Sequence, residues 1–140
     1  MHKFKENYKP AYGVFSSALG GETNDKVETA TYVDMKYYDV AVAYVTATNV
    51  ANGQKITLQL LEATDSSGTN ATAISGKTDT FTSTGTSVKD VLQAEVRAEE
   101  LSSGYRYVGF RVSTDDADGQ EYIGGILLQG RARYGSSSLP

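Results

Sequence analysis

The sequence predicts an all-β protein that folds as a single-domain β-sandwich or jelly roll with an extended N-terminal arm. Short segments with a two-residue hydrophobic period recur along the chain, and turn-forming residues separate them. The aromatic residues are 10 Tyr and 4 Phe with no Trp, a set that favours strands. About six to eight short strands at such spacing, without a convincing helix, are typical of a sandwich, jelly roll or barrel.

The 140 residues suit one domain, which we divide into an arm, a body and a tail. The expected boundaries are residues 1–26 for the N-terminal arm, 27–134 for the β-sandwich domain and 135–140 for a polar C-terminal tail. Within the arm, the aromatic and aliphatic content of residues 12–19 favours an ordered segment packed on a partner. Residues 1–10 are charged, and they fit either an ordered arm or a disordered terminus.

The first strands of the body are expected between residues 27 and 63. Apolar and polar residues alternate at 27–34, and residues 40–48 are apolar on both faces, which predicts a strand covered on both sides. Asn52-Gly53 is a strong turn signal, and residues 55–63 alternate again. The sequence therefore predicts that the strands at 40–48 and 55–63 form a hairpin.

The second half of the chain contains further strand patterns. Residues 88–101 fit a helix or a strand by period alone, and the surrounding β pattern favours a strand that ends in a turn at 99–104. The last strand is apolar on both faces and contains glycines, which indicates a central position and a bulge or close backbone approach. The expected strands lie at residues 71–75, 78–84, 88–98, 105–114 and 121–134, the first two anchored by Ile74 and Phe81.

Composition excludes several classes of partner and site. The net charge is −4 and the pI about 4.9, whereas nucleic-acid-binding proteins are usually basic, so we expect no nucleic-acid partner. The absence of cysteine rules out disulfides and thiolate metal sites. No apolar run approaches the roughly 18 residues of a membrane span, and the N-terminus lacks the apolar core of a signal peptide. We therefore expect no membrane contact.

Residues able to perform acid–base or metal chemistry are scarce. The single histidine, His2, adjoins the initial methionine on a charged segment, so neither a Ser-His-Asp triad nor a His-ligated metal centre is expected. One acidic group has the oxygens that Ca²⁺ prefers without the spacing of an EF-hand, and a solvated hairpin tip is the favoured interpretation. It consists of Asp115, Asp116, Asp118 and Glu121. We expect no enzyme activity and no cofactor. The alternative is a glycosidase-like pair of carboxylates that lie far apart in the sequence.

Tyrosine and arginine side chains are the candidates for a contact surface. Amphipathic aromatics together with Arg are favoured at protein interfaces, and aromatic faces also stack on sugars. Three interpretations stay open: half-buried positions at sheet edges, an oligomer or partner interface, and a sugar-stacking platform. The candidate interface residues, from the arm and from the body, are Tyr8, Tyr12, Phe15, Leu19, Tyr37, Tyr38, Tyr105, Tyr107 and Arg111.

Several segments, taken in order, carry a resemblance to a known class of proteins. They are SSALGG at residues 16–21, the strand at 27–34, ITLQL at 56–60 with EATDSSG at 62–68, GYRYV at 104–108, and ILL at 126–128 running on to ARY at 132–134. In their order of appearance the chain from Tyr12 to Tyr134 resembles the small head decoration (cement) proteins of tailed bacteriophages. No motif of this class fixes individual residues, so the resemblance assigns no site residue.

The resemblance implies a β-sandwich or jelly roll that binds the major capsid protein on the outer surface of a phage capsid and stabilises the shell at capsomer joints. It also implies a homo-oligomer, with a trimer favoured over a dimer, in the host cytoplasm during assembly and afterwards on the capsid exterior. The arm, residues 1–21, is expected to reach a neighbouring subunit. The alternatives are a carbohydrate-binding or adhesin module and another virion part, such as a head-fibre or tail component.

Overall fold

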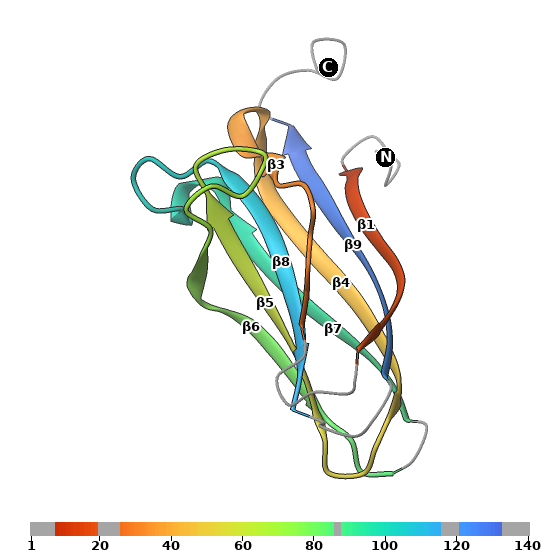
Figure 1. Ribbon diagram of the computed structural model, residues 1–140. Helices are drawn as coiled ribbons and strands as arrows, with labels where there is room; N and C mark the ends of the chain where they lie inside the picture. The colour runs from red at the N-terminus through yellow and green to blue at the C-terminus, as the bar shows by residue number, and fades with distance from the viewer. Residues whose placement is uncertain (1–7, 20–25, 86–87, 116–120, 133–140) are drawn as a thin grey trace.

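Two antiparallel β-sheets pack face to face in the structure, a computed structural model that describes residues 8–19, 26–85, 88–115 and 121–132 (Figure 1). The first sheet has the strand order β1-β9-β4-β7, with the bounds Tyr8–Leu19, Glu121–Ala132, Tyr38–Val50 and Val88–Arg97. The second sheet has the order β2-β8-β5-β6, with the bounds Lys26–Glu28, Tyr107–Thr114, Lys55–Ala63 and Thr72–Thr82. The short strand β3 (Val33–Asp34) also pairs with β8, and two 3₁₀ helices are η1 (Met35–Tyr37) and η2 (Ala98–Glu100).

The chain crosses repeatedly between the two sheets. Among the described strands, only β5 and β6 are consecutive in the chain and paired with each other; the other pairings join strands that lie apart in the sequence. Strands wound in this way over two sheets, one of four strands and one of five, make a jelly roll, a fold that protects most sheet edges without closing a barrel. The all-β jelly-roll sandwich expected from the sequence is confirmed.

The core lies between the sheets, and small residues of β4 in it face large residues of the second sheet. Every second residue of β4 faces inward, and Ala41 and Ala43 have no exposed surface. The large ring of Phe110 on β8 is also buried in this core. A Cβ atom at Gly125 would lie 3.0 Å from Val45 Cγ2 and 3.2 Å from Phe110 Cζ. The close backbone approach expected in the last strand therefore occurs at this glycine.

The expected hairpin between residues 40–48 and 55–63 is wrong. The turn at Asn52-Gly53 does join β4 to β5, and Gly53 adopts a φ of 85° that suits glycine. However, β4 pairs with β7 and β9 in the first sheet, whereas β5 pairs with β6 and β8 in the second. Both edges of each strand are thus occupied by partners from elsewhere in the chain, and the turn leads from one layer to the other.

The single strand expected at residues 27–34 is divided into β2 and β3. β2 ends at Glu28, and Thr29 then bonds to Phe110 through its backbone N–H and its side-chain oxygen. The next residues leave the sheet edge, so that Tyr32 covers the outer side of β8 and donates its backbone N–H to Ser66 O at 2.9 Å. Pairing with β8 resumes at Val33. The expected strand is therefore divided in two because the Tyr32 side chain packs on the outer side of the sheet.

The part of the expected arm that the structure describes belongs to the sandwich. Residues 8–19 form β1, which pairs antiparallel with β9 from Tyr8 opposite Gly130 to Leu19 opposite Glu121. This segment is therefore an edge strand of the first sheet. The sequence predicts an extended arm here, ordered over residues 12–19. The rest of the arm and the tail at 135–140 lie outside the described residues.

Most other strands lie where the sequence predicts them. β5 has the expected bounds, β7 confirms the strand interpretation of residues 88–98, and β9 is central between β1 and β4. The two strands expected at 71–75 and 78–84 form one irregular strand, β6. Its anchors are confirmed, because Ile74 is buried in the core and Phe81 packs against it.

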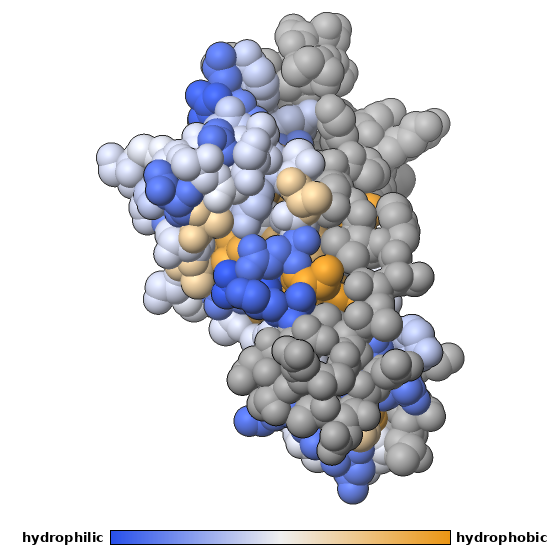
Figure 2. Space-filling model, in the orientation of Figure 1, coloured by the Kyte–Doolittle hydropathy of each residue, from blue (hydrophilic) through white to orange (hydrophobic). Residues whose placement is uncertain are grey.

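The surface on the side drawn in Figure 1 is mostly hydrophilic, and apolar residues gather in one area near its middle (Figure 2). Within the described ranges, no helix has the length and apolarity needed to cross a membrane.

Candidate functional site

The exposed large hydrophobic side chains of the described residues lie on the first sheet, on the side facing away from the core. Because Ala43 and Val45 point inward, their neighbours on β4 point outward. The exposed large hydrophobic residues are Tyr44, Val91 and Tyr122, with 39%, 57% and 50% of their surface exposed. All three lie on this side of the first sheet. We call it the outer face and define it by Val42, Tyr44, Val91, Tyr122, Ile126 and Leu128.

The strand register brings the residues of the outer face together. Tyr44 on β4 lies opposite Ile126 on β9, and Val42 lies opposite Leu128. Val42 and Leu128 are each only 8% exposed, yet neither belongs to the core cluster. They therefore form an apolar layer of their own behind the exposed tyrosine. This confirms that β4 is apolar on both faces, with the outward one only partly covered.

Polar residues border the outer face along β7. Gln93 lies opposite Tyr44, and Glu95 lies opposite Val42. A shallow hollow of about 230 Å³ is lined by these four residues and Ala94. An apolar centre with a polar rim is the arrangement typical of protein interfaces.

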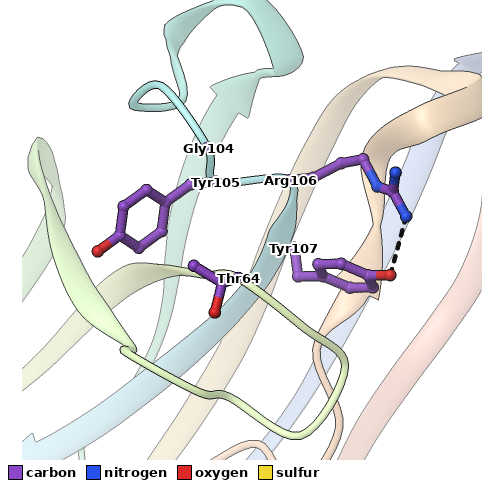
Figure 3. A pocket seen from close by; sticks show the side chains of 5 residues that line it. All are labelled: Thr64, Gly104, Tyr105, Arg106 and Tyr107. Atoms are coloured by element: carbon purple, nitrogen blue, oxygen red, sulfur yellow. Dashed lines mark hydrogen bonds between the residues drawn. The ribbon is translucent and has the colours of Figure 1, made fainter.

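A second candidate is an open pocket where β5 ends and β8 begins, which we call the tyrosine pocket. It has a volume of about 440 Å³ and is lined by Thr64, Gly104, Tyr105, Arg106 and Tyr107. Figure 3 shows the rings of Tyr105 and Tyr107 on either side of Thr64. A tight turn places the first ring, since Gly104 has a φ of 87° and Tyr105 N donates to Ser102 O at 2.9 Å.

Arg106 is held in place beside this pocket by two neighbours. Its Nε lies 2.8 Å from Asp34 Oδ1, and its Nη2 donates to Asp34 Oδ2 at 3.0 Å and to Tyr107 Oη at 2.9 Å. The guanidinium carbon lies 5.2 Å from the centroid of the Tyr107 ring. The hydrogen bond to Tyr107, and then the charge of Asp34, raise the pKa of Arg106. The guanidinium therefore stays charged and fixes the position of the Tyr107 hydroxyl.

The residues expected to form an interface are distributed over several environments. Tyr105 and Tyr107 meet in the tyrosine pocket. Tyr37 packs against the core, and its ring centroid lies 5.0 Å from Lys36 Nζ. Tyr38 is only 7% exposed and belongs to the core, so it presents no contact surface.

The remaining expected residues lie on β8 and β1. Arg111 is half-buried, and its Nε donates to Glu28 Oε1 at 2.7 Å, so its charge is paired within the chain. The residues Tyr8, Tyr12, Phe15 and Leu19 lie on β1, where their backbone is described and their side chains are not.

Sequence reasoning missed the residues of the outer face. A signal was present, because β4 and β9 are apolar on both faces. This pattern predicted that both faces of the two strands are covered, whereas Tyr44 and Tyr122 lie half-exposed. Only the sheet order decides which apolar face has a covering layer.

The acidic group at residues 115–121 is described only in part. Asp115 Oδ1 accepts the backbone N–H of Lys55 at 2.6 Å, a contact that fastens the end of β8 to β5. Asp116 and Asp118 lie outside the described residues, so cation binding by this group stays a prediction. Within the described chain, no cluster of three or more His, Asp or Glu residues could hold a metal ion.

Comparison with known proteins identifies similar folds. The sequence matches no protein-family model and no curated protein. Among solved structures, the VP2 subviral particle of infectious bursal disease virus has 8% identity and a TM-score of 0.55, over 95% of this chain and 35% of that one. The K3 adhesin domain of Lys-gingipain from Porphyromonas gingivalis has 13% identity and a TM-score of 0.51, over 81% and 71% of the chains.

A family 16 carbohydrate-binding module has 15% identity and a TM-score of 0.46, over 79% of this chain and 72% of that one. The chain spans about a third of the length of the viral protein it matches. At these identities the comparisons show a fold alone, a jelly-roll β-sandwich similar to that of the viral capsid protein and the adhesin domain.

Proposed function

We propose that the protein is a non-enzymatic virion structural protein that binds the outer surface of a phage capsid and stabilises it at capsomer joints. The observation that carries the proposal is the outer face, where Tyr44, Val91 and Tyr122 are exposed on one side of a rigid sheet. Contiguous apolar patches with a polar rim mark interaction sites on soluble proteins. A broad, nearly flat face suits a protein surface better than a small molecule, which needs a concave site.

The partner in this proposal is the major capsid protein. Tyrosine is enriched among the residues that contribute most of the binding energy at protein interfaces. Tyr44 and Tyr122 are the exposed tyrosines of the outer face. A shell presents the same joint many times, so an oligomer that engages several subunits gains avidity from modest single contacts. We therefore include self-association in the proposal, as a trimer or, second, as a dimer. The viral capsid protein with a similar fold supports the proposal as a precedent for a jelly roll in a shell.

The outer face replaces the arm as the proposed contact. β1 is fixed in the sheet by its pairing with β9, so residues 8–19 do not reach across a joint. The described residues instead offer a preformed surface, which loses little conformational entropy on binding.

The proposal is tested by co-sedimentation with capsids of the encoding phage that lack their own copy of the protein. We expect saturable pelleting at a fixed ratio to the capsid protein. The double variant Tyr44→Ser/Tyr122→Ser should bind at least about tenfold more weakly, which corresponds to about 1.4 kcal/mol. The matched control Tyr105→Ser removes a half-exposed tyrosine from the other sheet and should pellet like the parent.

Two results would contradict the proposal. If the parent protein does not pellet, capsid binding is wrong. If Tyr105→Ser weakens pelleting and the double variant does not, the capsid contact lies elsewhere than the outer face. Sedimentation velocity of the parent protein measures its self-association separately.

A further inference from the structure

The tyrosine pocket belongs to the second sheet, so the outer face and the pocket lie on different layers of the sandwich. Tyr107 is on β8, where Val108 points into the core, and its own side chain therefore points outward. A molecule that binds a capsid through the first sheet would leave this pocket accessible. The pocket is thus available for a separate ligand.

The aromatic part of the pocket is preorganised. Tyr105 and Tyr107 are two residues apart, and their rings lie on either side of Thr64 (Figure 3). Tyr107 packs against a small cluster of Tyr32, Leu61 and Ala63, and its hydroxyl accepts from Arg106 at 2.9 Å. One ring is therefore fixed and the other half-exposed at the rim. The half-exposed ring of Tyr105 beside polar groups suits a ligand that has both apolar C–H faces and polar edges.

The polar groups of the pocket include both donors and acceptors. The Thr64 hydroxyl donates to Thr69 O at 3.0 Å, which leaves its oxygen as an acceptor. The Tyr107 hydroxyl accepts from Arg106 and keeps its own proton to donate. The contacts of Arg106 with Asp34 and Tyr107 use Nε and Nη2, so the N–H groups of Nη1 remain as donors. Hydroxyl groups on a ligand can meet all three, because each hydroxyl both donates and accepts.

The charge of the pocket favours a neutral ligand. The guanidinium of Arg106 faces the carboxylate of Asp34 through two contacts, of 2.8 Å and 3.0 Å. An anion would have to compete with this carboxylate for the same N–H groups. A neutral polyhydroxyl ligand would not, and it would use the donors that the ion pair leaves.

We propose that the tyrosine pocket binds a neutral saccharide, with one sugar ring stacked on Tyr105 beside Thr64 and Tyr107. The volume of about 440 Å³ lies within the roughly 300–1,000 Å³ of small-molecule sites. The pocket is open, so affinity is expected to be weak for one copy and to increase with multivalent display. The inference is independent of the proposed capsid binding, and on a capsid it would give each particle many sugar-binding sites.

Nuclear magnetic resonance titration of the full ¹⁵N-labelled chain tests this proposal. The neutral probes are maltotriose, cellotriose, β-1,4-galactotriose and diacetylchitobiose; the anionic probes are 3′-sialyllactose and inorganic phosphate. We expect at least one neutral probe to shift the amide signals of residues 64 and 104–107 in a saturable way. Tyr105→Ala should weaken that binding about tenfold. The matched control Tyr44→Ala, on the outer face, should bind the probe like the parent protein.

The alternative outcomes are distinct. Saturable shifts with the anionic probes alone would overturn the assignment of a neutral ligand and indicate an anion site at Arg106. Shifts with none of the four neutral probes, or shifts that Tyr105→Ala leaves unchanged, would overturn the proposed pocket. The spectrum of each variant reports its folding in the same experiment. Capsid co-sedimentation is unaffected by either result, so failure of this inference is distinguishable from failure of the proposed function.

Discussion

Tyr32 shows how single residues shape the outside of the second sheet. Its ring lies between two glycines, where an added Cβ would come within 2.6 Å at Gly68 and 2.7 Å at Gly109. Only glycine at both positions leaves room for the ring. The side chain is 4% exposed, and its hydroxyl has no hydrogen-bond partner among the residues that the structure describes. The ring thus covers Leu61 and Ala63 while its hydroxyl is desolvated without compensation.

We predict that Tyr32→Phe stabilises the protein by about 1 kcal/mol, because a buried polar group without a partner opposes folding. Urea denaturation at neutral pH measures the difference through the midpoint and slope of the transition. Tyr107→Phe is the matched control: it removes a hydroxyl that accepts from Arg106 at 2.9 Å, so it should destabilise by about 0.5 kcal/mol. A loss of stability in Tyr32→Phe would show that its hydroxyl is bonded in solution.

Ionisation of Tyr32 should also make the free energy of unfolding depend on pH in the alkaline range. Burial, and then the negative charge of Glu28, raise the pKa of Tyr32 above its ordinary value of 10.0. An unfolded chain ionises this phenol near pH 10 while the folded chain keeps it neutral, so the free energy of unfolding falls as pH rises above 10. Tyr32→Phe should therefore show a smaller alkaline loss than the parent. Equal slopes for the two proteins above pH 10 would contradict this.

At the scale of elements, periodicity located the strands and long-range pairing decided their neighbours. β5 has the expected bounds; its residues alternate in burial from Lys55 to Leu60, and both faces are buried from Leu61 to Ala63. The predicted hairpin between β4 and β5 is wrong because a turn reverses the chain without specifying which sheet the next strand joins. β1 was missed as a strand because its register with β9 has two irregularities, between Pro10 and Tyr12 and between Val14 and Ser17. Such shifts interrupt a two-residue period.

We predict that β1 is required for folding. A variant beginning at Glu22 removes the strand that pairs with β9 and leaves β9 as an unprotected edge. It should lose the cooperative unfolding transition in circular dichroism, because small domains have only about 5–15 kcal/mol of stability. A variant beginning at Tyr8 keeps all of β1 and should unfold at the midpoint of the parent. If the variant beginning at Glu22 unfolds there as well, residues 8–19 behave as a removable arm.

At the scale of the molecule, the two sheets present surfaces of different character. The outer face of the first sheet is apolar and exposed, whereas Tyr32 and the loop at 64–70 cover part of the second. Sequence reasoning selected tyrosine as the contact residue and found Tyr105 and Tyr107. It could not separate Tyr38 in the core from Tyr44 on the surface, since both lie in one apolar strand and burial depends on neighbouring strands.

This difference predicts the orientation of the protein on a capsid. The chain contains no cysteine, so single cysteines introduced as Gln93→Cys on the outer face or Ser66→Cys near the tyrosine pocket report their own accessibility. Both residues are exposed, and both variants should react with a maleimide equally fast in free protein. Capsid binding should slow labelling of the Gln93→Cys variant by about tenfold or more and leave the Ser66→Cys variant unchanged, since buried interface atoms exclude water and reagent. The reverse pattern would place the second sheet against the capsid and close the tyrosine pocket in the assembled particle.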